Sequence, residues 1–382
     1  MNQEIILLHI SLIEGIGPIT VKKMLQKMPY GFDYVDLYKL KESDFVTIFG
    51  FSKSVALKLV SGLKDKSKVK KEYELIKKNK INFVTVVSEN YPELLKNIYA
   101  PPVVLYWQGA DLLSENKKIA FVGSRKAHRY AERAIERIVP DIVSAGWIVV
   151  SGGAIGADSM AHREAVHFGG KTIAVLGSGL LHPYPSSNKR LFEQIIQKGG
   201  ALVSSFSLQT IAKPGNFPSR NRVIAGLSLG CVVVQAAQKS GASITAQLAL
   251  DEGREVFAIP GPIDDELSVG CHSLIKQGAK LVSDSSDILT ELSHYYPSAL
   301  SSSIDNETLH QAVIFQDDED DDSSRGNQTI ESVVTSCCSS PCSIDDLVIK
   351  TDIAIGDLHE ILFDLQISGR IKQNHAGMWE RS

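Results

Sequence analysis

The stretch KIAFVGS, residues 118–124, sets a pattern that the middle of the chain repeats. Four consecutive apolar residues run into a glycine and a serine, and an amphipathic segment with helical spacing follows at residues 130–146. A strand that is covered by helices on both faces has this nearly continuous apolar character. The stretch therefore predicts a buried β-strand followed by a helix.

Six further apolar runs of the same kind alternate with amphipathic segments toward the carboxyl end of the chain. They are WIVVSGG at 147–153, TIAVLGSG at 172–179, ALVSSF at 201–206, CVVVQAA at 231–237, EVFAIPG at 255–261 and KLVSD at 280–284. Seven strands separated by helices predict an α/β fold with a doubly wound, Rossmann-like parallel sheet. Two more apolar runs within residues 81–113 are expected to extend this sheet, so that the predicted core spans residues 81–297.

Smaller domains are predicted on either side of the core. Residues 1–65 have apolar helical patterns interrupted by glycine turns and resemble a helix-hairpin-helix or sterile-alpha-motif-like unit, whose free turn amides can hold a phosphate. A plain helical cap is an equally good interpretation. Residues 298–328 are rich in serine and aspartate, as in flexible linkers. Residues 329–382 suggest a winged helix, but its helical stretch is acidic, so a protein partner is at least as good an interpretation as DNA.

The composition is that of a globular protein with uneven charge. The 382 residues are 43% hydrophobic and 22% charged, and the formal net charge of -4 argues against a wholly basic nucleic-acid coat protein. Ten lysines and three acidic residues lie between Lys53 and Lys80, and residues 317–322 are all acidic. A solvated surface or linker is the simplest interpretation of both runs.

Several features favour a cytoplasmic protein. The amino-terminal stretch has no signal-peptide pattern, and no window reaches the roughly 18 apolar residues that a membrane span needs. Five cysteines are an odd and sparse number, which favours a reducing compartment. Cys337, Cys338 and Cys342 lie close together without a matching ligand pair, so an ordinary surface loop is favoured over a zinc site.

The loops after the predicted strands suit a bound anion. In a parallel sheet these loops meet at the carboxyl edge, where ligands bind. Small residues there leave backbone N–H groups free at helix starts, and arginine side chains accompany them, a combination that suits phosphate. We therefore predict that Arg125, Arg220 and Arg222 surround an anion pocket. The alternative for any one of them is pairing with a carboxylate such as Asp158 to brace the loops.

These loops do not match the common nucleotide motifs. Residues 152–156 and 177–179 lack the Gly-x-Gly-x-x-Gly spacing of a dinucleotide site, and the chain has no Gly-x-x-x-x-Gly-Lys-Ser/Thr loop. The sequence thus predicts no cofactor. Asp158 and His162 lie four residues apart on one predicted helix face, where packing and hydrogen bonding are favoured over metal binding.

Six blocks of the core form a pattern of their own. They are FVGSRKAHRYAE, SGGAIGADSMAHREAV, IAVLGSGLLHPYPSSNKRLFEQI, FPSRNRVIAGLS, SGASITAQLALDEGREVFAIPG and SVGCHSLIKQGAKLV, in this order across roughly residues 117–290. The set resembles the family of bacterial DNA-processing proteins known as DprA or Smf. The resemblance implies a non-enzymatic protein that binds single-stranded DNA and helps to load the recombinase RecA during natural transformation. It also implies a homodimer formed through the Rossmann-like domain.

The resemblance and the loop pattern together predict a set of DNA-contacting residues. The predicted residues are Gly123, Ser124, Arg125, Lys213, Phe217, Arg220, Asn221, Arg222, Ser240 and Gly241. Phe217 is expected to stack on a base. The family often has Ser-Glu where this chain has Ser204-Ser205, and it often has Glu-Ala where this chain has Gln235-Ala236. Both departures remove a carboxylate near the pocket, which disfavours an acid–base role there.

Two other functions compete with this one. A nucleoside-phosphate hydrolase of the phosphoribohydrolase type has a related sheet, but it needs a Pro-Gly-Gly-x-Gly-Thr loop followed by a glutamate, which IPGPIDDEL at 259–267 does not match. A protein-binding scaffold would use the carboxyl-terminal domain and the lysine-rich run as contact surfaces. Binding of nucleic acid by the isolated core would favour single-stranded DNA binding over the scaffold function.

Overall fold

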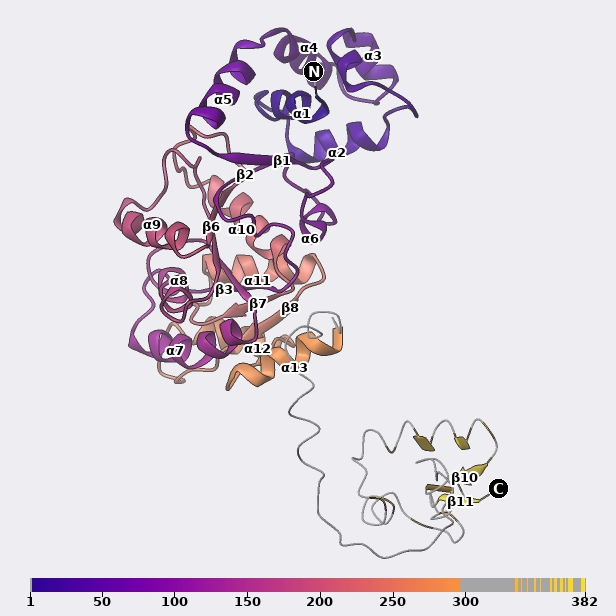
Figure 1. Ribbon diagram of the computed structural model, residues 1–382, viewed down its shortest axis with the longest axis vertical. Helices are drawn as coiled ribbons and strands as arrows, with labels where there is room; N and C mark the ends of the chain where they lie inside the picture. The colour runs from indigo at the N-terminus through magenta and orange to yellow at the C-terminus, as the bar shows by residue number, and fades with distance from the viewer. Residues whose placement is uncertain are drawn as a thin grey trace, which may run out of the picture. The chain divides into compact units, whose positions relative to one another are not determined.

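The computed structural model of the protein describes residues 2–295 and, beyond them, a set of residues between 334 and 381 (Figure 1). The chain forms two compact units, residues 1–305 and residues 306–382. The predicted acidic linker at 298–328 lies outside the described residues. No helix among the described residues combines the length and the apolar character that crossing a membrane requires.

A nine-stranded sheet forms the centre of the first unit (Figure 1). Its strands are β1 (Asn82–Thr85), β2 (Val104–Gly109), β3 (Lys118–Val122), β4 (Ile148–Ser151), β5 (Thr172–Val175), β6 (Ala201–Ser204), β7 (Gly230–Val233), β8 (Glu255–Ala258) and β9 (Lys280–Leu281). They lie in the order β1-β2-β6-β5-β4-β3-β7-β8-β9. From β6 to β9 all neighbours are parallel, whereas β2 is antiparallel to both β1 and β6. The predicted doubly wound parallel sheet is confirmed.

Helices cover both faces of this sheet. They are α6 (Glu93–Lys96), α7 (Arg129–Ser144), α8 (Ala157–His167), α9 (Lys189–Gln197), α10 (Asn216–Leu227), α11 (Gly241–Asp251), α12 (Val269–Lys276) and α13 (Ser285–Tyr295), with a 3₁₀ turn η2 (Ser186–Asn188). In β3, Ile119 and Phe121 pack in one cluster with residues of α7, α8 and α13, whereas Ala120 and Val122 pack with residues of α10 and α11. Successive strand side chains point to opposite faces, so an unbroken apolar run fills both layers.

The chain reverses its direction of sheet growth at β3. From β3 it adds β4, β5 and β6 on one side, and it then returns to place β7 on the other side of β3. The connections that leave these two strands diverge, which opens a crevice beyond their carboxyl ends. A hydrogen bond of 2.7 Å from the Ser124 amide to the Gln235 carbonyl joins the two strand ends.

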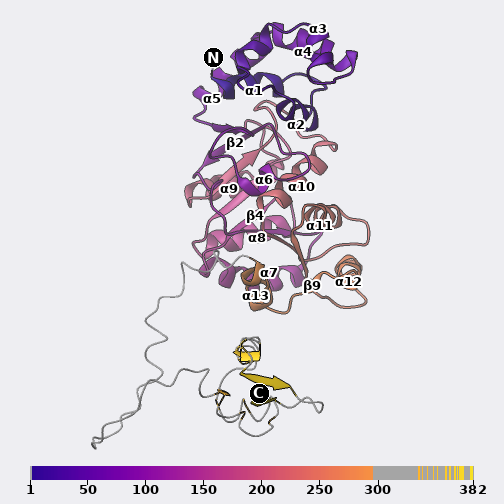
Figure 2. The ribbon, with the colours of Figure 1, turned by 90° about the vertical axis from the view of Figure 1, so that its right-hand side faces the viewer.

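Short helices precede the sheet at the end of the unit that carries β1 and β2 (Figure 2). They are α1 (Gln3–Ser11), α2 (Pro18–Gln26), the 3₁₀ helix η1 (Tyr34–Tyr38), α3 (Glu42–Thr47), α4 (Lys53–Lys64) and α5 (Ser67–Lys78). Phe45, Phe49 and Phe51 form an aromatic centre with ring centroids 5.7 and 5.9 Å apart. The helix α5 lies between the two predicted domains, and its buried Glu72 accepts a 2.7 Å hydrogen bond from the Leu208 amide of the sheet region.

In the second unit, the described residues include a two-stranded antiparallel ribbon. Its strands are β10 (Ile371–Gln373) and β11 (Trp379–Arg381). Buried residues such as Leu358 and Leu362 pack with Trp379 in a small core, and the sulfur atoms of Cys338 and Cys342 are 3.9 Å apart. The ribbon lies within residues 329–382, which the sequence predicts to form a winged helix. Cys337 and most of the acidic helical stretch lie outside the described residues, so the winged helix as a whole stays a prediction.

Candidate functional site

A crevice of about 450 Å³ lies beyond the carboxyl ends of β3 and β7. The loop after β3, the first turns of α10 and the start of α11 form its walls. It brings together eight of the ten predicted residues: Gly123, Ser124, Arg125, Phe217, Arg220, Asn221, Ser240 and Gly241. Lys213 and Arg222 are not in its wall.

The loop after β3 is held tightly and presents Arg125 to solvent. The Ser124 carbonyl accepts a 3.2 Å hydrogen bond from the Ala157 amide at the start of α8, and the Ser124 hydroxyl accepts one of 3.0 Å from the Lys126 amide. A side chain at Gly123 would lie 2.5 Å from the Ala157 Cβ atom, so only glycine allows this approach. The exposed Arg125 guanidinium lies 5.0 Å from the centroid of the Phe217 ring. This places a fixed cation beside an aromatic face.

The start of α11 forms another wall of the crevice. Ser240 is the N-cap, and its hydroxyl accepts a 3.2 Å hydrogen bond from the Ser243 amide. The remaining amides of the first turn have no partner within the helix, and the helix dipole adds partial positive charge at this end. Asn221 joins the two walls, since its side-chain amide donates to the Gly241 carbonyl at 3.4 Å.

Arg220 is part of the scaffold of the crevice. Its side chain is only 5% exposed, and its guanidinium donates to the carbonyls of Gly152 and Val175, the latter at 2.8 Å. These carbonyls lie at the ends of β4 and β5, so one cation holds two strand ends together. Burial lowers the pKa of Arg220, while the neighbouring Asp158 carboxylate acts in the opposite direction. Arg220 therefore braces the loops, which is the alternative that the sequence left open for any one of the three arginines.

Asp158 and His162 act within the same scaffold. The Asp158 carboxylate accepts hydrogen bonds from the amides of Gly152 at 3.1 Å and Ala154 at 3.3 Å, and burial raises its pKa despite these contacts and the nearby Arg220. His162 is fully buried and its Nδ1 atom lies 2.7 Å from the Thr172 hydroxyl. Burial lowers the pKa of His162 to about 3, so the imidazole is neutral. Both residues have the hydrogen-bonding role that the sequence favoured over metal binding.

Arg222 points away from the crevice. Two residues along a helix correspond to a rotation of about 200°, so Arg220 and Arg222 cannot share a face of α10. The Arg222 guanidinium lies 6.0 Å from the centroid of the Tyr99 ring. Lys213 is exposed in the loop before α10, where its carbonyl accepts the Asn216 amide at 2.9 Å. Contrary to the prediction from the sequence, the three arginines therefore do not surround one pocket. Arg125 is exposed in the crevice, Arg220 is buried in its wall, and Arg222 lies outside the wall.

A second hollow of about 160 Å³ adjoins the crevice and contains residues that the sequence did not single out. Ile155 and Tyr184, which are 54% and 49% exposed, line it together with Phe217. The rings of Tyr184 and Phe217 have centroids 6.2 Å apart. The only signal in the sequence was an aromatic residue in the loop after the third predicted strand, and its approach to Phe217 depends on the packing of α10.

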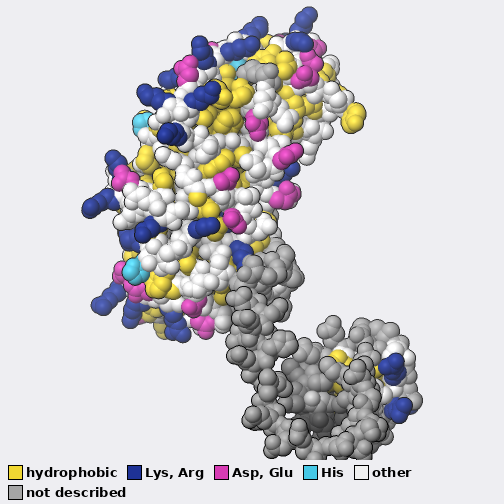
Figure 3. All heavy atoms as spheres, in the orientation of Figure 1, with side chains coloured by type: hydrophobic (Ala, Val, Ile, Leu, Met, Phe, Trp, Pro, Cys, Tyr) yellow, Lys and Arg dark blue, Asp and Glu magenta, His cyan; other side chains and the backbone are white. Residues whose placement is uncertain are grey.

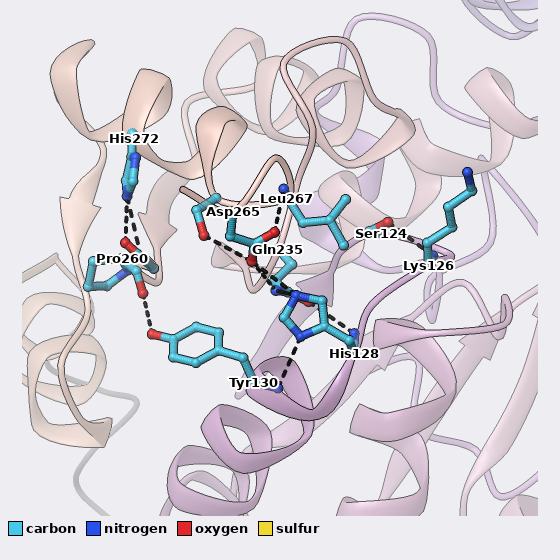
Figure 4. Close-up of polar contacts among 11 residues, drawn as sticks. Ser124, Lys126, His128, Tyr130, Gln235, Pro260, Asp265, Leu267 and His272 are labelled. Carbon is cyan, nitrogen blue, oxygen red and sulfur yellow. Dashed lines mark hydrogen bonds and ion pairs between the residues drawn. The ribbon is translucent and has the colours of Figure 1, made fainter. Parts of the chain in front are cut away.

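A polar network supports the loop after β3 from behind (Figure 4). The Gln235 side chain accepts a hydrogen bond from the His128 amide at 3.2 Å and donates to the Asp265 carboxylate at 3.0 Å, and His128 Nε2 lies 3.0 Å from the same carboxylate. Burial tends to raise the pKa of Asp265, but hydrogen bonds from the Leu267 amide and His128 lower it overall. A glutamate at position 235 would lack the donor for Asp265, which gives the departure at this position a structural meaning.

Comparison with known proteins identifies the family. The model of the family described as DNA recombination-mediator protein A matches residues 82–293, which include the whole crevice. The chain belongs to this family. The DNA processing protein DprA of Bacillus subtilis is 42% identical over 213 residues, which cover 56% of this chain and 71% of that protein. The protein Smf of Synechocystis is 30% identical, and the match covers 97% of both chains.

Solved structures agree with this family. DNA processing protein A from Streptococcus pneumoniae is 35% identical, with a TM-score of 0.60 and coverage of 72% of this chain and 98% of that chain. DNA processing protein A from Helicobacter pylori is 27% identical, with a TM-score of 0.51 and coverage of 56% and 97%, and its structure concerns a single-stranded DNA binding mode of that protein.

Proposed function

We propose that the crevice beyond β3 and β7 binds single-stranded DNA, and that the protein thereby helps to load RecA recombinase. The single observation that carries the proposal is the pairing of the exposed Arg125 guanidinium with the Phe217 ring, 5.0 Å from its centroid. Such a pair offers a phosphate contact and a stacking surface side by side. A single strand needs both, because its bases are not paired and its backbone is charged.

The phosphate contacts follow from the residues at the crevice mouth. The planar fork of Arg125 can donate two hydrogen bonds to one phosphate. The backbone amide of Gly241 and the side chain of Lys126, the residue after Arg125, add positive charge without contacting the edge of a base. Because all of these groups contact the backbone, we expect binding that is nearly independent of sequence and weakened by salt, with a log–log slope of about -0.7 per phosphate.

The base contacts belong to the adjoining apolar hollow. Phe217 and Tyr184 present two ring faces near each other, and Ile155 adds an exposed apolar side chain. Stacking of a base on such a ring is worth about 1–3 kcal/mol and tolerates any base. Lys213 and Arg222, outside the crevice wall, stay predictions of the sequence as further backbone contacts.

The recombination role is proposed from family membership. The family is described as a recombination mediator. The sequence has no dinucleotide-binding motif, and the described residues contain no cluster of metal ligands. We propose that the chain acts as a non-enzymatic homodimer that holds single-stranded DNA for RecA, in DNA recombination and natural transformation. A test of this part is whether the protein speeds assembly of RecA on strands coated with single-strand-binding protein.

The binding part is tested by fluorescence anisotropy with labelled oligo-dT. Arg125→Ala should weaken binding by roughly 10- to 100-fold at moderate salt, the range expected for loss of a charged hydrogen-bonding group. Arg190→Ala removes another exposed arginine, from α9, and should bind as wild type does. Equal affinities of wild type and Arg125→Ala would refute the mechanism.

A further inference from the structure

The segment from Lys53 to Lys80 concentrates positive charge in a chain that is negative overall. It has ten lysines against three acidic residues, a formal charge of +7, whereas the whole chain has -4. All ten lysine side chains are exposed on or beside α4 and α5. Dark blue side chains accordingly gather over this end of the first unit in Figure 3. We call these ten residues the lysine face: Lys53, Lys58, Lys64, Lys66, Lys68, Lys70, Lys71, Lys77, Lys78 and Lys80.

The acidic residues of the segment do little to neutralise the lysine face. Glu72 is buried and accepts from the Leu208 amide, so its carboxylate points into the protein. Asp65 accepts from the amide and the hydroxyl of Ser67 at 3.0 and 2.5 Å. Among the described residues, Lys53 alone of the ten has an ion pair, with Glu42 at 3.8 Å. Nine of the ten ammonium groups therefore have no ion pair with a described carboxylate, and the exposed Asp65 and Glu74 offset the positive charge only in part.

Two of these lysines line a hollow of about 240 Å³ beside the glycine turn between α1 and α2. Lys58 and Lys68 line it together with the acidic Glu14 and Asp65. A methyl group at Gly15, where φ is +80°, would lie 2.7 Å from the Lys58 ammonium, so this cation sits over the turn. The helix α2 begins just beyond, and its N-cap has no side-chain hydrogen bond.

The same arrangement occurs a second time between α3 and α4. Gly50 has a φ of +66°, and a methyl group there would lie 2.9 Å from the ammonium of Lys27. Two helix–turn–helix units in succession thus each carry an ammonium group over a glycine turn. A repeated cation of this kind suits a ligand whose negative charges also repeat, and a nucleic-acid backbone has this property.

The lysine face lacks the stacking surface that the crevice has. Among the large apolar side chains of residues 2–80 that are exposed, Tyr30 is the only aromatic one. Tyr38 and Tyr73 are partly buried and lie beneath Lys66 and Lys77, at 4.8 and 4.6 Å from ammonium to ring centroid. Single strands are held by stacking as well as charge, whereas the base faces of a duplex are already stacked on one another, so that binding without sequence readout goes to its phosphates.

We propose that the lysine face is a second DNA-binding surface, which holds the backbone of duplex DNA without reading its sequence. It is separate from the crevice, and it does not depend on the single-strand site. A protein with both surfaces would hold a single strand and a duplex at the same time, as joining a strand to its homologous duplex requires.

The test compares a labelled 20-bp duplex with oligo-dT in anisotropy titrations of the full chain across a range of salt. The variant combines Lys58→Ala, Lys68→Ala and Lys71→Ala. The matched control removes three exposed lysines of the sheet region: Lys171→Ala, Lys198→Ala and Lys276→Ala. If each lysine of the face contacts one phosphate, the first variant should lower the log–log salt slope for duplex by about 2.7 and weaken duplex binding roughly tenfold or more at 0.1 M salt.

The outcomes separate the two surfaces. The lysine-face variant should bind oligo-dT as wild type does, and Arg125→Ala should bind duplex as wild type does. The second surface is refuted if the wild-type chain does not bind duplex, if the variant keeps the wild-type salt slope, or if the control loses as much affinity. Binding to anionic phospholipid vesicles but not to duplex would also overturn it, in favour of a membrane surface.

Discussion

At the crevice beyond β3 and β7, one exposed guanidinium stands beside an aromatic ring, and a second, buried guanidinium holds the loops behind it. On the lysine face, ten exposed ammonium groups lie on or beside α4 and α5, and each can be removed without opening the core. Position decides what the crevice can bind, whereas the number of charges decides what the lysine face can bind. The difference predicts that single-strand binding depends on a few residues, while duplex binding declines gradually with each lysine that is lost.

The largest expected effect is a loss of stability on replacement of the buried arginine that supports the crevice. Arg220→Met should lower the free energy of unfolding by about 3–5 kcal/mol, because the change leaves buried carbonyls unpaired and removes the cation beside Asp158. Urea unfolding measures this loss. Arg190→Met, at an exposed site, should change stability by less than about 0.5 kcal/mol. Arg220→Lys should restore little, since an ammonium cannot reproduce the planar fork. Wild-type stability in Arg220→Met would show that the crevice has no buried brace.

The next effect sharpens the contrast in stacking. Phe217→Ala should weaken oligo-dT binding by about 1–3 kcal/mol through loss of the ring face, and duplex binding should stay unchanged. Phe217→Trp should retain most of the affinity. Phe168→Ala removes an exposed ring at the end of α8 and serves as the control in the same anisotropy titrations. A parallel loss of duplex and oligo-dT binding in Phe217→Ala would mean that the two surfaces are not independent.

A smaller effect is expected at the first glycine turn of the lysine face. Gly15→Ala should cost about 1–2 kcal/mol of stability because its φ of +80° disfavours a side chain, and it should move the Lys58 ammonium and weaken duplex binding. Gly146→Ala is the matched control, since its φ is +78° and nothing lies within 4 Å of the added methyl group, so that it should cost similar stability and leave duplex binding unchanged. Thermal unfolding and duplex titrations measure both. Equal duplex affinities of Gly15→Ala and Gly146→Ala would remove the turn from the proposed surface.

The smallest effect concerns the network behind the loop after β3. The pKa of Asp265 is lowered in the folded protein, so its carboxylate stabilises the fold above its unfolded pKa of about 4, and this stability is lost as the pH falls through the folded pKa. Asp265→Asn should therefore be less stable than wild type at neutral pH, and the two should converge in acid. Urea unfolding at several pH values measures this. A difference that grows as the pH falls would contradict the assignment.

Much of the architecture was predictable because it depends on local pattern. The apolar run from Ile119 to Val122 is continuous, and only a strand with helices on both faces buries all four side chains. The glycine and serine that follow it predicted a loop at the carboxyl edge of the sheet. Eight of the ten predicted site residues lie around one crevice because parallel strands bring their carboxyl ends together.

The roles of the arginines were not predictable from the same pattern. Arg220 and Arg222 are similar in sequence, but the rotation of α10 turns the first toward two strand ends and the second toward Tyr99. Tyr184 lies 33 residues before Phe217 in the sequence, and only the packing of α10 against the loop after β5 brings the rings together. Nothing in the neighbouring residues encodes such a meeting.

The sequence by itself determined the parallel sheet, the edge at which its loops gather and the excess of lysine between residues 53 and 80, because periodicity and charge are local properties. The tertiary structure alone decided which guanidinium is exposed, which aromatic rings pair and which lysines lie over a turn. These depend on helix rotation and on contacts between residues far apart in the chain. Burial then converts identical side chains into a brace in one place and a binding group in another, because desolvation makes an unpaired charge costly only inside the protein.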